Sequence, residues 1–178
     1  MSIPSINTPR LILRLFSEMD VDPMYAILRD EDVLRYFPHS GPLTRERVDK
    51  MIARLLKHWE EHGYGLWAVT SRENSSLMGR CGLQLIPETG EVEIDFILGK
   101  PFWGQGLATE AAQTSLGYAF EQLRIEFIVG IVHPENSFSQ RVLEKLGMRL
   151  VEHSHYFGMK VFRYIIERST WESMAKRD

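Results

Sequence analysis

The sequence contains a single cysteine, Cys81, among its 178 residues. One cysteine cannot form an internal disulfide, and it cannot supply a metal centre built from several thiolates. Because Cys81 lies in a run of alternating residues, we expect a small packing residue there and not a nucleophile. A disulfide-stabilised scaffold and a cysteine-based metal centre are both excluded.

Long apolar runs and a strong charge of either sign are also missing. No apolar stretch approaches the roughly 20 residues that cross a bilayer. The net charge of −3 gives no electrostatic reason to expect nucleic acid or an anionic membrane as a partner. Residues 1–5 lack the basic and then apolar pattern of a secretory signal. We therefore expect a cytoplasmic protein with no nucleic-acid or membrane partner.

What the chain does contain is ordinary for a globular domain, with 44% apolar and 25% charged residues. A chain of this length buries about 70% of its unfolded surface when it forms one domain. No internal repeat, low-complexity segment or linker interrupts the sequence. We expect residues 1–178 to form a single domain.

Hydrophobic periodicity predicts an α+β domain. Alternation predicts strands over residues 10–16, 64–70, 77–86, 91–98, 127–132, 148–153 and 160–168, the last two joined by a loop at 155–159. Helical spacing predicts helices from Ser17 or Asp20 to Leu28, over 44–63, from the glycines at 104 and 106 to about Phe120, and over 137–146, with a short additional helix at 30–37. The order β-α-α-β-β-β-α-β-α-β-β indicates a single mixed, mostly antiparallel sheet with helices on both faces.

The most specific stretch is a glycine turn between a predicted strand and a predicted helix. Gly104 and Gly106 allow a sharp bend, and the helix that follows directs unpaired N–H groups into it. Such a turn is an anion site, most often for phosphate. A dinucleotide site is rejected because Thr109 stands where a third glycine belongs and no train of βα units follows. A simple tight connection is the remaining alternative.

Two motifs together resemble one known family. Trp103-Gly104-Gln105-Gly106-Leu107-Ala108-Thr109-Glu110-Ala111 resembles the acetyl-coenzyme A loop of the GCN5-related N-acetyltransferases (GNAT), as W-G-x-G-x-A-T-E-A. That run is typical of the branch that acetylates the N-termini of ribosomal proteins. Residues 136–148 resemble the second signature, N-x-x-S-x-x-x-x-x-K-L-G-F, with Met148 in place of phenylalanine. The resemblance extends from Arg10 to Trp171, and it implies a GNAT-like fold with acetyl-CoA as co-substrate.

The resemblance also implies a donor site that spans both motifs. Backbone N–H groups in the glycine turn would hold the pyrophosphate, and an exposed strand edge would pair with the pantetheine amides. Asn136 can bond a pantetheine amide, and capping of the following helix is a compatible second role for it. The expected donor-binding residues are Phe96, Ile97, Leu98, Trp103, Gly104, Gln105, Gly106, Leu107, Ala108, Thr109, Asn136 and Ser139.

Acidic residues alternate with apolar ones in the strand before the glycine turn. Glu91, Glu93 and Asp95 therefore lie on one face, where a carboxylate can attract a cationic amine and pass its proton to solvent. Glu93 matches the acidic position common in the family and is the expected catalytic base. Asp95 stands where many relatives have glycine. A solvated polar face on a half-exposed sheet is the alternative interpretation of all three.

The departing thiolate needs a proton. Ser139 is the expected catalytic donor, because its hydroxyl can offer one. Phe138 occupies the region where many members of the family use a tyrosine as the general acid. Tyr156 and Tyr164 are left open as substitutes.

No metal is expected. His58 and His62 lie one helical turn apart, but Trp59 stands where a metalloprotease motif needs glutamate. Two imidazoles close to the helix end at Gly63 are explained more simply as partners of the helix dipole.

The resemblance implies direct transfer of acetyl from acetyl-CoA to an amine, with a protein N-terminal amine of the ribosomal type as the expected acceptor. A small amine such as a polyamine or an aminoglycoside is the alternative acceptor, and a non-catalytic acetyl-CoA sensor is the alternative class of protein. We expect the acceptor surface in the helices between residues 17 and 62 and in the loop at 155–159. The oligomeric state is left open, a homodimer included.

Overall fold

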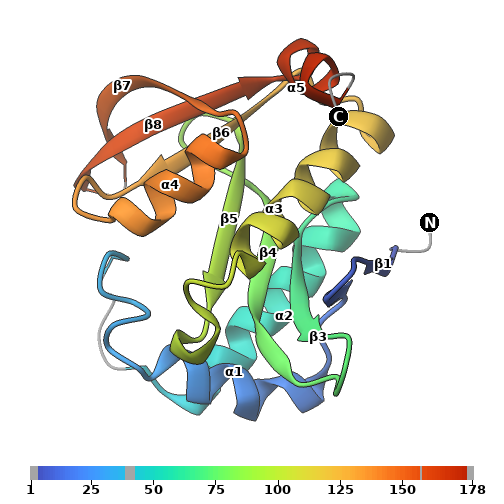
Figure 1. Cartoon of the computed structure of the whole chain (residues 1–178). Coiled ribbons are helices and arrows are strands. Elements are labelled where there is room, and N and C mark those ends of the chain that lie inside the picture. The colour runs from blue at the N-terminus through green and yellow to red at the C-terminus, as the bar shows by residue number, and fades with distance from the viewer. Residues whose placement is uncertain (1–3, 39–42, 157, 176–178) are drawn as a thin grey trace.

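One sheet runs through the whole molecule (Figure 1). The computed structural model describes residues 4–38, 43–156 and 158–175. Among these, eight strands lie in the order β1-β2-β3-β4-β5-β6-β8-β7. They are β1 (Ile6–Asn7), β2 (Leu11–Arg14), β3 (Leu66–Ser71), β4 (Leu77–Leu85), β5 (Val92–Leu98), β6 (Phe127–Val132), β7 (Arg149–Tyr156) and β8 (Met159–Glu167). Only β5 and β6 pair in parallel, so the predicted mixed, mostly antiparallel sheet is confirmed.

Helices cover both faces of the sheet. They are α1 (Val21–Leu28), α2 (Arg45–His62), α3 (Leu107–Gly117), α4 (Ser137–Lys145) and α5 (Arg168–Ala175). Ala68 and Ile97 of the sheet are buried with residues of α1 and α2, whereas Trp67 and Leu98, one position away, are buried with residues of α3 and α4. Pleating sends alternate side chains to opposite faces, which divides the apolar residues between two cores. The predicted placement of helices on both faces is confirmed.

The buried face of α3 is rich in small side chains, with Leu107 and Leu116 beside them. Ala111, Ala112 and Ser115 are fully buried in this contact. The helix predicted to reach Phe120 ends at Gly117 and continues as a π-helical turn over Tyr118–Gln122. Close packing of α3 fixes the position of its N-terminus, which lies at the end of β5.

The chain has one strand before and one helix after the predicted order. The two residues of β1 pair with Leu13 and Ile12, but so short a strand has no periodicity to detect. At the other end α5 brings Trp171 against Phe120, with ring centroids 5.8 Å apart. None of the described helices combines the length and the apolar character that a membrane span requires.

Residues 30–37 form turns, so the short helix predicted there is wrong. The backbone N–H of Val33 bonds to Asp30, and that of Phe37 bonds to Leu34, both as isolated three-residue turns. An ion pair between Asp32 and Lys100 ties this segment to the connection between β5 and α3. Contacts with distant residues therefore replace the repeating bonds of a helix.

The loop predicted at 155–159 is also wrong in its boundaries. His155 and Tyr156 belong to β7, and they pair with Lys160 and Met159 of β8. Phe157 lies outside the described residues. Strand pairing continues almost to the tip of this hairpin. Backbone bonds between β7 and β8 hold these residues in the strands, although the alternation of apolar and polar residues in the sequence ends earlier.

β5 and β6 separate soon after they meet. Their ladder has a single pair, Glu93 with Val129. Beyond it, β5 keeps its pairing with β4 on one side, while its other edge is left without a strand partner. The separation of these strands matches the strand edge that the resemblance implied for a pantetheine arm.

Candidate active site

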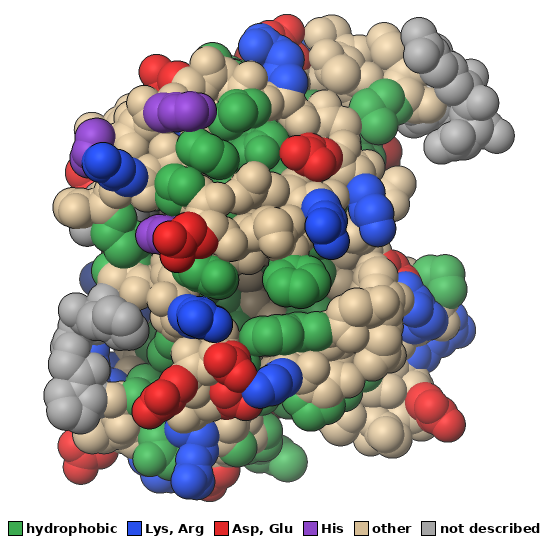
Figure 2. All heavy atoms as spheres, turned by 60° about the vertical axis from the view of Figure 1, so that its left-hand side comes forward, with side chains coloured by type: hydrophobic (Ala, Val, Ile, Leu, Met, Phe, Trp, Pro, Cys, Tyr) green, Lys and Arg blue, Asp and Glu red, His purple; other side chains and the backbone are tan. Residues whose placement is uncertain are grey.

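Two cavities open where β5 and β6 separate, and they share part of their lining. The α3–α4 cavity, about 530 Å³, lies between the start of α3 and the face of α4. The β4–β6 cavity, about 320 Å³, lies over β4, β5, β6 and the start of β8. Both are lined by Tyr36, Phe37, Phe96, Asn136 and Ser139. Figure 2 shows hydrophobic side chains around a hollow on this side of the molecule, with acidic and basic side chains near its rim.

The glycine turn forms one wall of the α3–α4 cavity. Gly104 and Gly106 have φ angles of 73° and 76°, in the left-handed region that disfavours side chains. Gly106 is the N-cap of α3 and supplies no side-chain cap to the N–H groups of the first turn. These donors and the helix dipole are therefore directed at a ligand in the cavity.

Side chains from outside the turn hold its shape. The indole N–H of Trp103 donates to the carbonyl of Leu98 at 2.7 Å. Arg10 donates from Nη1 to the carbonyl of Gln105 at 2.9 Å and forms an ion pair with Glu110 at 2.7 Å. Because these partners lie just before β2, on β5 and on α3, the turn is organised by the fold itself.

The opposite wall of the α3–α4 cavity is α4. The side chain of Asn136 accepts a hydrogen bond from the backbone N–H of Ser139 at 3.1 Å, which confirms its capping role. Arg141 and Lys145, one helical turn apart, also line the cavity. Sequence reasoning missed both basic residues, although their four-residue spacing within the second motif was a usable signal. The wall carries positive charge suited to an anionic ligand.

Glu93 lies in the β4–β6 cavity and is only 6% exposed. Burial raises the pKa of its carboxyl group to about 8, and the negative charge of Asp95 adds to that effect. Hydrogen bonds from Gln84 Nε2, at 3.0 Å, and from the backbone N–H of Ile131 act in the opposite direction. A carboxyl group whose pKa lies near the pH at which the protein works is suited to accept a proton.

Asp95 lies beside Glu93 and faces a cation. Its Oδ2 is 2.9 Å from Nη2 of Arg80, and both side chains are largely buried, at 9% and 13% exposure. Arg80 lies on β4, opposite Ile97, and reaches Asp95 diagonally across the ladder. Sequence reasoning missed Arg80 and Gln84, because only strand register brings β4 residues beside these acids.

Glu91, the third acid of the series, lies outside the two cavities. Arg163 of β8 forms an ion pair with it, and the hydroxyl of Tyr156 donates to it at 3.4 Å. Glu93 and Asp95 are buried, so the interpretation of this strand as a solvated polar face is wrong. Strand alternation places the acids on one face, and the neighbouring strands decide which of them meets the cavity.

An aromatic pair lies where the cavities meet. Tyr36, from the segment between α1 and α2, stacks on His133, with ring centroids 5.2 Å apart and planes inclined by 26°. His133 follows β6 and lines the β4–β6 cavity, while Tyr36 lines both cavities. Neither was predicted, because the segment of Tyr36 owes its path to distant contacts.

Neither alternative tyrosine lines either cavity. Tyr164 is 3% exposed and is packed in the core on the α4 side. Tyr156 is bonded to Glu91. Of the three predicted proton donors, Ser139 is the one that lines both cavities.

The structure brings together nearly all of the expected donor-binding residues. Gln105 is the exception among them, since its side chain donates to the carbonyl of Pro101 at 2.8 Å and does not line the cavity.

The rings of His58 and His62 lie 4.4 Å apart at the end of α2. In the part of the chain that the structure describes, no cluster of three or more His, Cys, Asp or Glu could hold a metal ion. Cys81 is fully buried, as expected of a packing residue.

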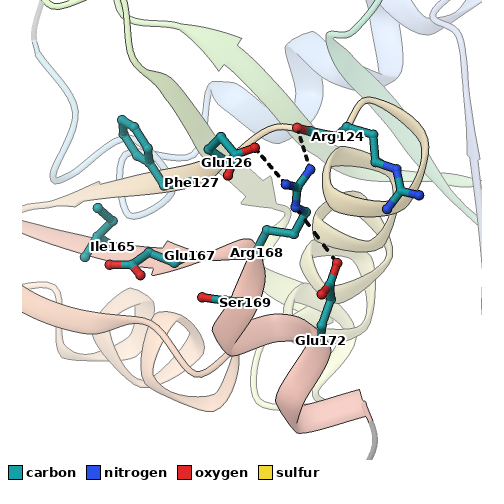
Figure 3. Close-up of a pocket in the computed structure, with 8 residues that line it drawn as sticks. All are labelled: Arg124, Glu126, Phe127, Ile165, Glu167, Arg168, Ser169 and Glu172. Carbon is teal, nitrogen blue, oxygen red and sulfur yellow. Dashed lines mark hydrogen bonds and ion pairs between the residues drawn. The ribbon is translucent and has the colours of Figure 1, made fainter.

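A further depression lies at the other end of β6 (Figure 3). Arg168 crosses it, pairs with Glu126 at 2.7 Å, and donates to the carbonyl of Arg124 at 3.0 Å. Arg168 also lies 3.9 Å from Glu172, so the central cation of the depression is already paired within the protein. The depression is therefore a weaker candidate for a reactive site than the two joined cavities.

Comparison with known proteins identifies the family. Residues 10–149 match the family model described as the acetyltransferase (GNAT) domain. That match covers most of the chain, so the chain belongs to the GNAT family and is an N-acetyltransferase. The family generally uses acetyl-CoA.

Individual relatives agree with this assignment. The chain is 28% identical over 144 residues to "Uncharacterized protein YkkB" of Bacillus subtilis, covering 79% of this chain and 83% of that protein. It is 33% identical over 132 residues to "Probable N-acetyltransferase YjcK" of the same organism, covering 72% and 67%.

Solved structures show the same fold. An acetyltransferase from Agrobacterium tumefaciens has a TM-score of 0.82 at 25% identity, covering 94% of this chain and 96% of that one. A ribosomal-protein-S5-alanine acetyltransferase from Vibrio fischeri has a TM-score of 0.78 at 14% identity, covering 94% and 98%. At that low identity the second likeness concerns the fold alone.

Proposed function

We propose that this protein transfers acetyl from acetyl-CoA directly to a primary amine. The observation that carries the proposal is the meeting of the two cavities at Phe96, Asn136 and Ser139, with Glu93 on one side and the glycine turn on the other. A donor and an acceptor bound in separate cavities would meet at that junction. No covalent intermediate with the protein is needed.

The α3–α4 cavity suits coenzyme A. Backbone N–H groups from Gln105 to Thr109 would hold the pyrophosphate at the N-terminus of α3, and Arg141 and Lys145 would add positive charge. The free edge of β5 at Phe96, Ile97 and Leu98 would pair with the amides of the pantetheine arm. Trp103, Leu107, Ala108 and Asn136 complete the set of donor-binding residues.

The β4–β6 cavity suits the acceptor amine and its deprotonation. The amine nitrogen attacks the thioester carbon, the carbon–sulfur bond breaks, and coenzyme A leaves as a thiolate. Glu93 takes the amine proton, directly or through water. The hydroxyl of Ser139 donates a hydrogen bond to the thiolate and relays a proton to it from solvent, so the serine stays protonated. The pKa of about 8 makes Glu93 a stronger base than an ordinary carboxylate.

A protein N-terminal amine of the ribosomal type is the acceptor we propose. The W-G-x-G-x-A-T-E-A run supports it. The buried base favours an enzyme over a silent sensor, because binding of acetyl-CoA alone needs no carboxylate in the second cavity.

Release of thiol from acetyl-CoA, measured with a panel of N-terminal peptides and small amines, tests this function. We expect Glu93→Gln to lower kcat/KM by roughly a hundredfold, the typical contribution of a general base. Glu91→Gln, an acid just before the same strand and outside the cavities, is the matched control and should stay within about twofold of the wild type.

Two results would overturn the proposal. Binding of acetyl-CoA without turnover across the panel would favour a sensor. Failure to bind coenzyme A in calorimetry would remove both the enzyme and the sensor.

A further inference from the structure

Arg80 is a buried cation that the protein leaves incompletely bonded. Its Nε has no hydrogen-bond partner among the described residues, and Nη1 finds only the sulfur of Met51, at 3.9 Å. Nη2 approaches Asp95 Oδ2 at 2.9 Å, but that oxygen has no hydrogen bond of proper geometry. Buried polar groups are nearly always bonded, so these exceptions need a partner.

The position of Arg80 indicates where that partner comes from. The side chain of Arg80 lines the β4–β6 cavity together with Glu93, Asp95 and Gln84. A purely structural ion pair would be expected to complete its hydrogen bonds within the protein, since burying two charges is costly without them. Nε itself has almost no accessible surface, so the donors left for an oxygen of a bound molecule are Nη1 and Nη2, at the end of a side chain that is 13% exposed.

We propose that Arg80 recognises the carbonyl oxygen next to the reacting amine, so that the β4–β6 cavity selects an N-terminal α-aminoacyl group. This inference rests on the proposed function of the same site. Glu93 would bind the amine, and the guanidinium of Arg80 would donate to the neutral carbonyl oxygen of the same residue. Arg80 is thus a specificity-determining residue.

The charges of the cavity favour a neutral carbonyl over a carboxylate. Asp95 already balances Arg80, so the carboxylate of a free amino acid would meet the negative charge of Asp95. A polyamine has no oxygen to satisfy the guanidinium, which would stay unpaired when such an acceptor binds. An amino-acid amide or a peptide N-terminus carries both an amine and a neutral carbonyl, and it suits both ends of the cavity.

The test compares acceptors that differ in the carbonyl group. Alanine amide and an alanine-initiated peptide amide carry it, sec-butylamine has nearly the same shape without it, and free alanine replaces it by a carboxylate. With acetyl-CoA as donor, we expect wild-type kcat/KM to be highest for the two amides. The two amides distinguish a small molecule from a polypeptide as the source of the group.

The double variant Arg80→Met/Asp95→Asn removes one charge of each sign and keeps the net charge of the cavity. We expect kcat/KM for alanine amide to fall roughly tenfold to a hundredfold, mainly through KM, as for the loss of a hydrogen bond from a charged group. Because a change in the pKa of Glu93 affects every acceptor alike, the decisive quantity is the ratio of kcat/KM for alanine amide to that for sec-butylamine, which should fall by the same factor. Measurable turnover of sec-butylamine also reports that the variant is folded. Arg80→Lys keeps the charge and loses the planar fork, so it should show a smaller loss confined to the amides.

The possible results distinguish a specificity-determining Arg80 from a purely structural ion pair. Equal losses for alanine amide and sec-butylamine would make the ion pair structural and overturn the inference, as would equal wild-type rates for all acceptors. If wild-type turnover depends on Glu93 but the ratio of acceptors does not change in the double variant, only this inference fails. If no acceptor is turned over and coenzyme A does not bind, the proposed function fails as well.

Discussion

At the scale of single residues, the central feature is Glu93, a buried carboxyl group that forms no ion pair of its own among the described residues. Glu93 and Asp95 are both buried, and Arg80 pairs with Asp95. Glu93 receives hydrogen bonds from Gln84 and from the backbone, and these do not offset the loss of water and the nearby negative charge. The pKa of about 8 follows from this division of partners.

The raised pKa of Glu93 predicts a stability effect of definite sign. Above the ordinary pKa of 4.5 the unfolded chain loses this proton while the folded protein keeps it until about pH 8. The free energy of unfolding of the wild type therefore falls across that interval, at about 1.4 kcal/mol per unit of pKa difference. We expect Glu93→Gln to be more stable than the wild type at pH 8, by at least about 1 kcal/mol, with the difference vanishing near pH 4.

Thermal unfolding at a series of pH values measures this difference. Glu91→Gln is the control of opposite sign. Burial is the largest single influence on Glu91 and would raise its pKa, but the hydrogen bonds from Arg163, Thr89 and Tyr156 and the charge of Arg163 together outweigh burial and lower the pKa. Its carboxylate therefore stabilises the fold above the ordinary pKa, and the Gln variant should be less stable at pH 7 and recover as the pH falls. A Glu93→Gln variant less stable than the wild type at pH 8 would contradict the assignment.

At the scale of elements, the start of α3 is where local sequence and ligand binding coincide. Gly106 ends the turn in a left-handed conformation, and no atom closer than 3.6 Å opposes a side chain there. The glycine is therefore required by backbone conformation and not by crowding within the protein. Gly63, at the C-terminus of α2, has the same conformation with open space around it.

Substitutions at these two glycines distinguish an effect on the stability of the fold from an effect on the binding of coenzyme A. Gly106→Ala and Gly63→Ala should each cost about 1–2 kcal/mol of unfolding free energy, because alanine is strained at positive φ. Only Gly106→Ala should also raise the Kd for coenzyme A, by roughly tenfold, since it distorts the turn that presents the N–H groups. Chemical denaturation and calorimetry measure the two effects, and equal Kd values for both variants would contradict a pyrophosphate site at this turn.

At the scale of the whole molecule, the sheet is complete except where β5 and β6 separate. The first strands carry the α1–α2 core, the last carry α4, and both cavities open between these parts. A ligand in the α3–α4 cavity would supply the missing partner along the edge of β5. Binding should therefore stabilise this junction more than the rest of the sheet.

Hydrogen exchange tests this expectation. Saturating coenzyme A should slow amide exchange at Phe96, Ile97 and Leu98 and in the first turn of α3, by roughly tenfold or more for newly bonded groups. The hairpin of β7 and β8 serves as an internal control and should change little. Uniform slowing across all strands would indicate general stabilisation and no added strand partner.

Much of the fold and part of the site were predictable from local pattern. Alternation in β5 correctly placed Glu93 and Asp95 on one face, and the capping role of Asn136 followed from its residue type. The segment at 30–37 was mispredicted because its ion pair to Lys100 is a distant contact. Tyr36 was missed for the same reason, since its stacking on His133 joins segments nearly a hundred residues apart in sequence.

The sequence by itself determined the glycine turn, the small face of α3 and the acidic strand, because each depends on backbone freedom or side-chain alternation within a few neighbouring residues. Only the tertiary structure decided that Glu93 is buried with no ion pair of its own within the described ranges of the chain, that Asp95 pairs with Arg80, and that Glu91 pairs with Arg163. These partners come from other strands, and their proximity follows from register across the sheet. The proton chemistry of this acetyltransferase is set at that level, since burial and neighbouring charge determine which carboxyl group can act as a base.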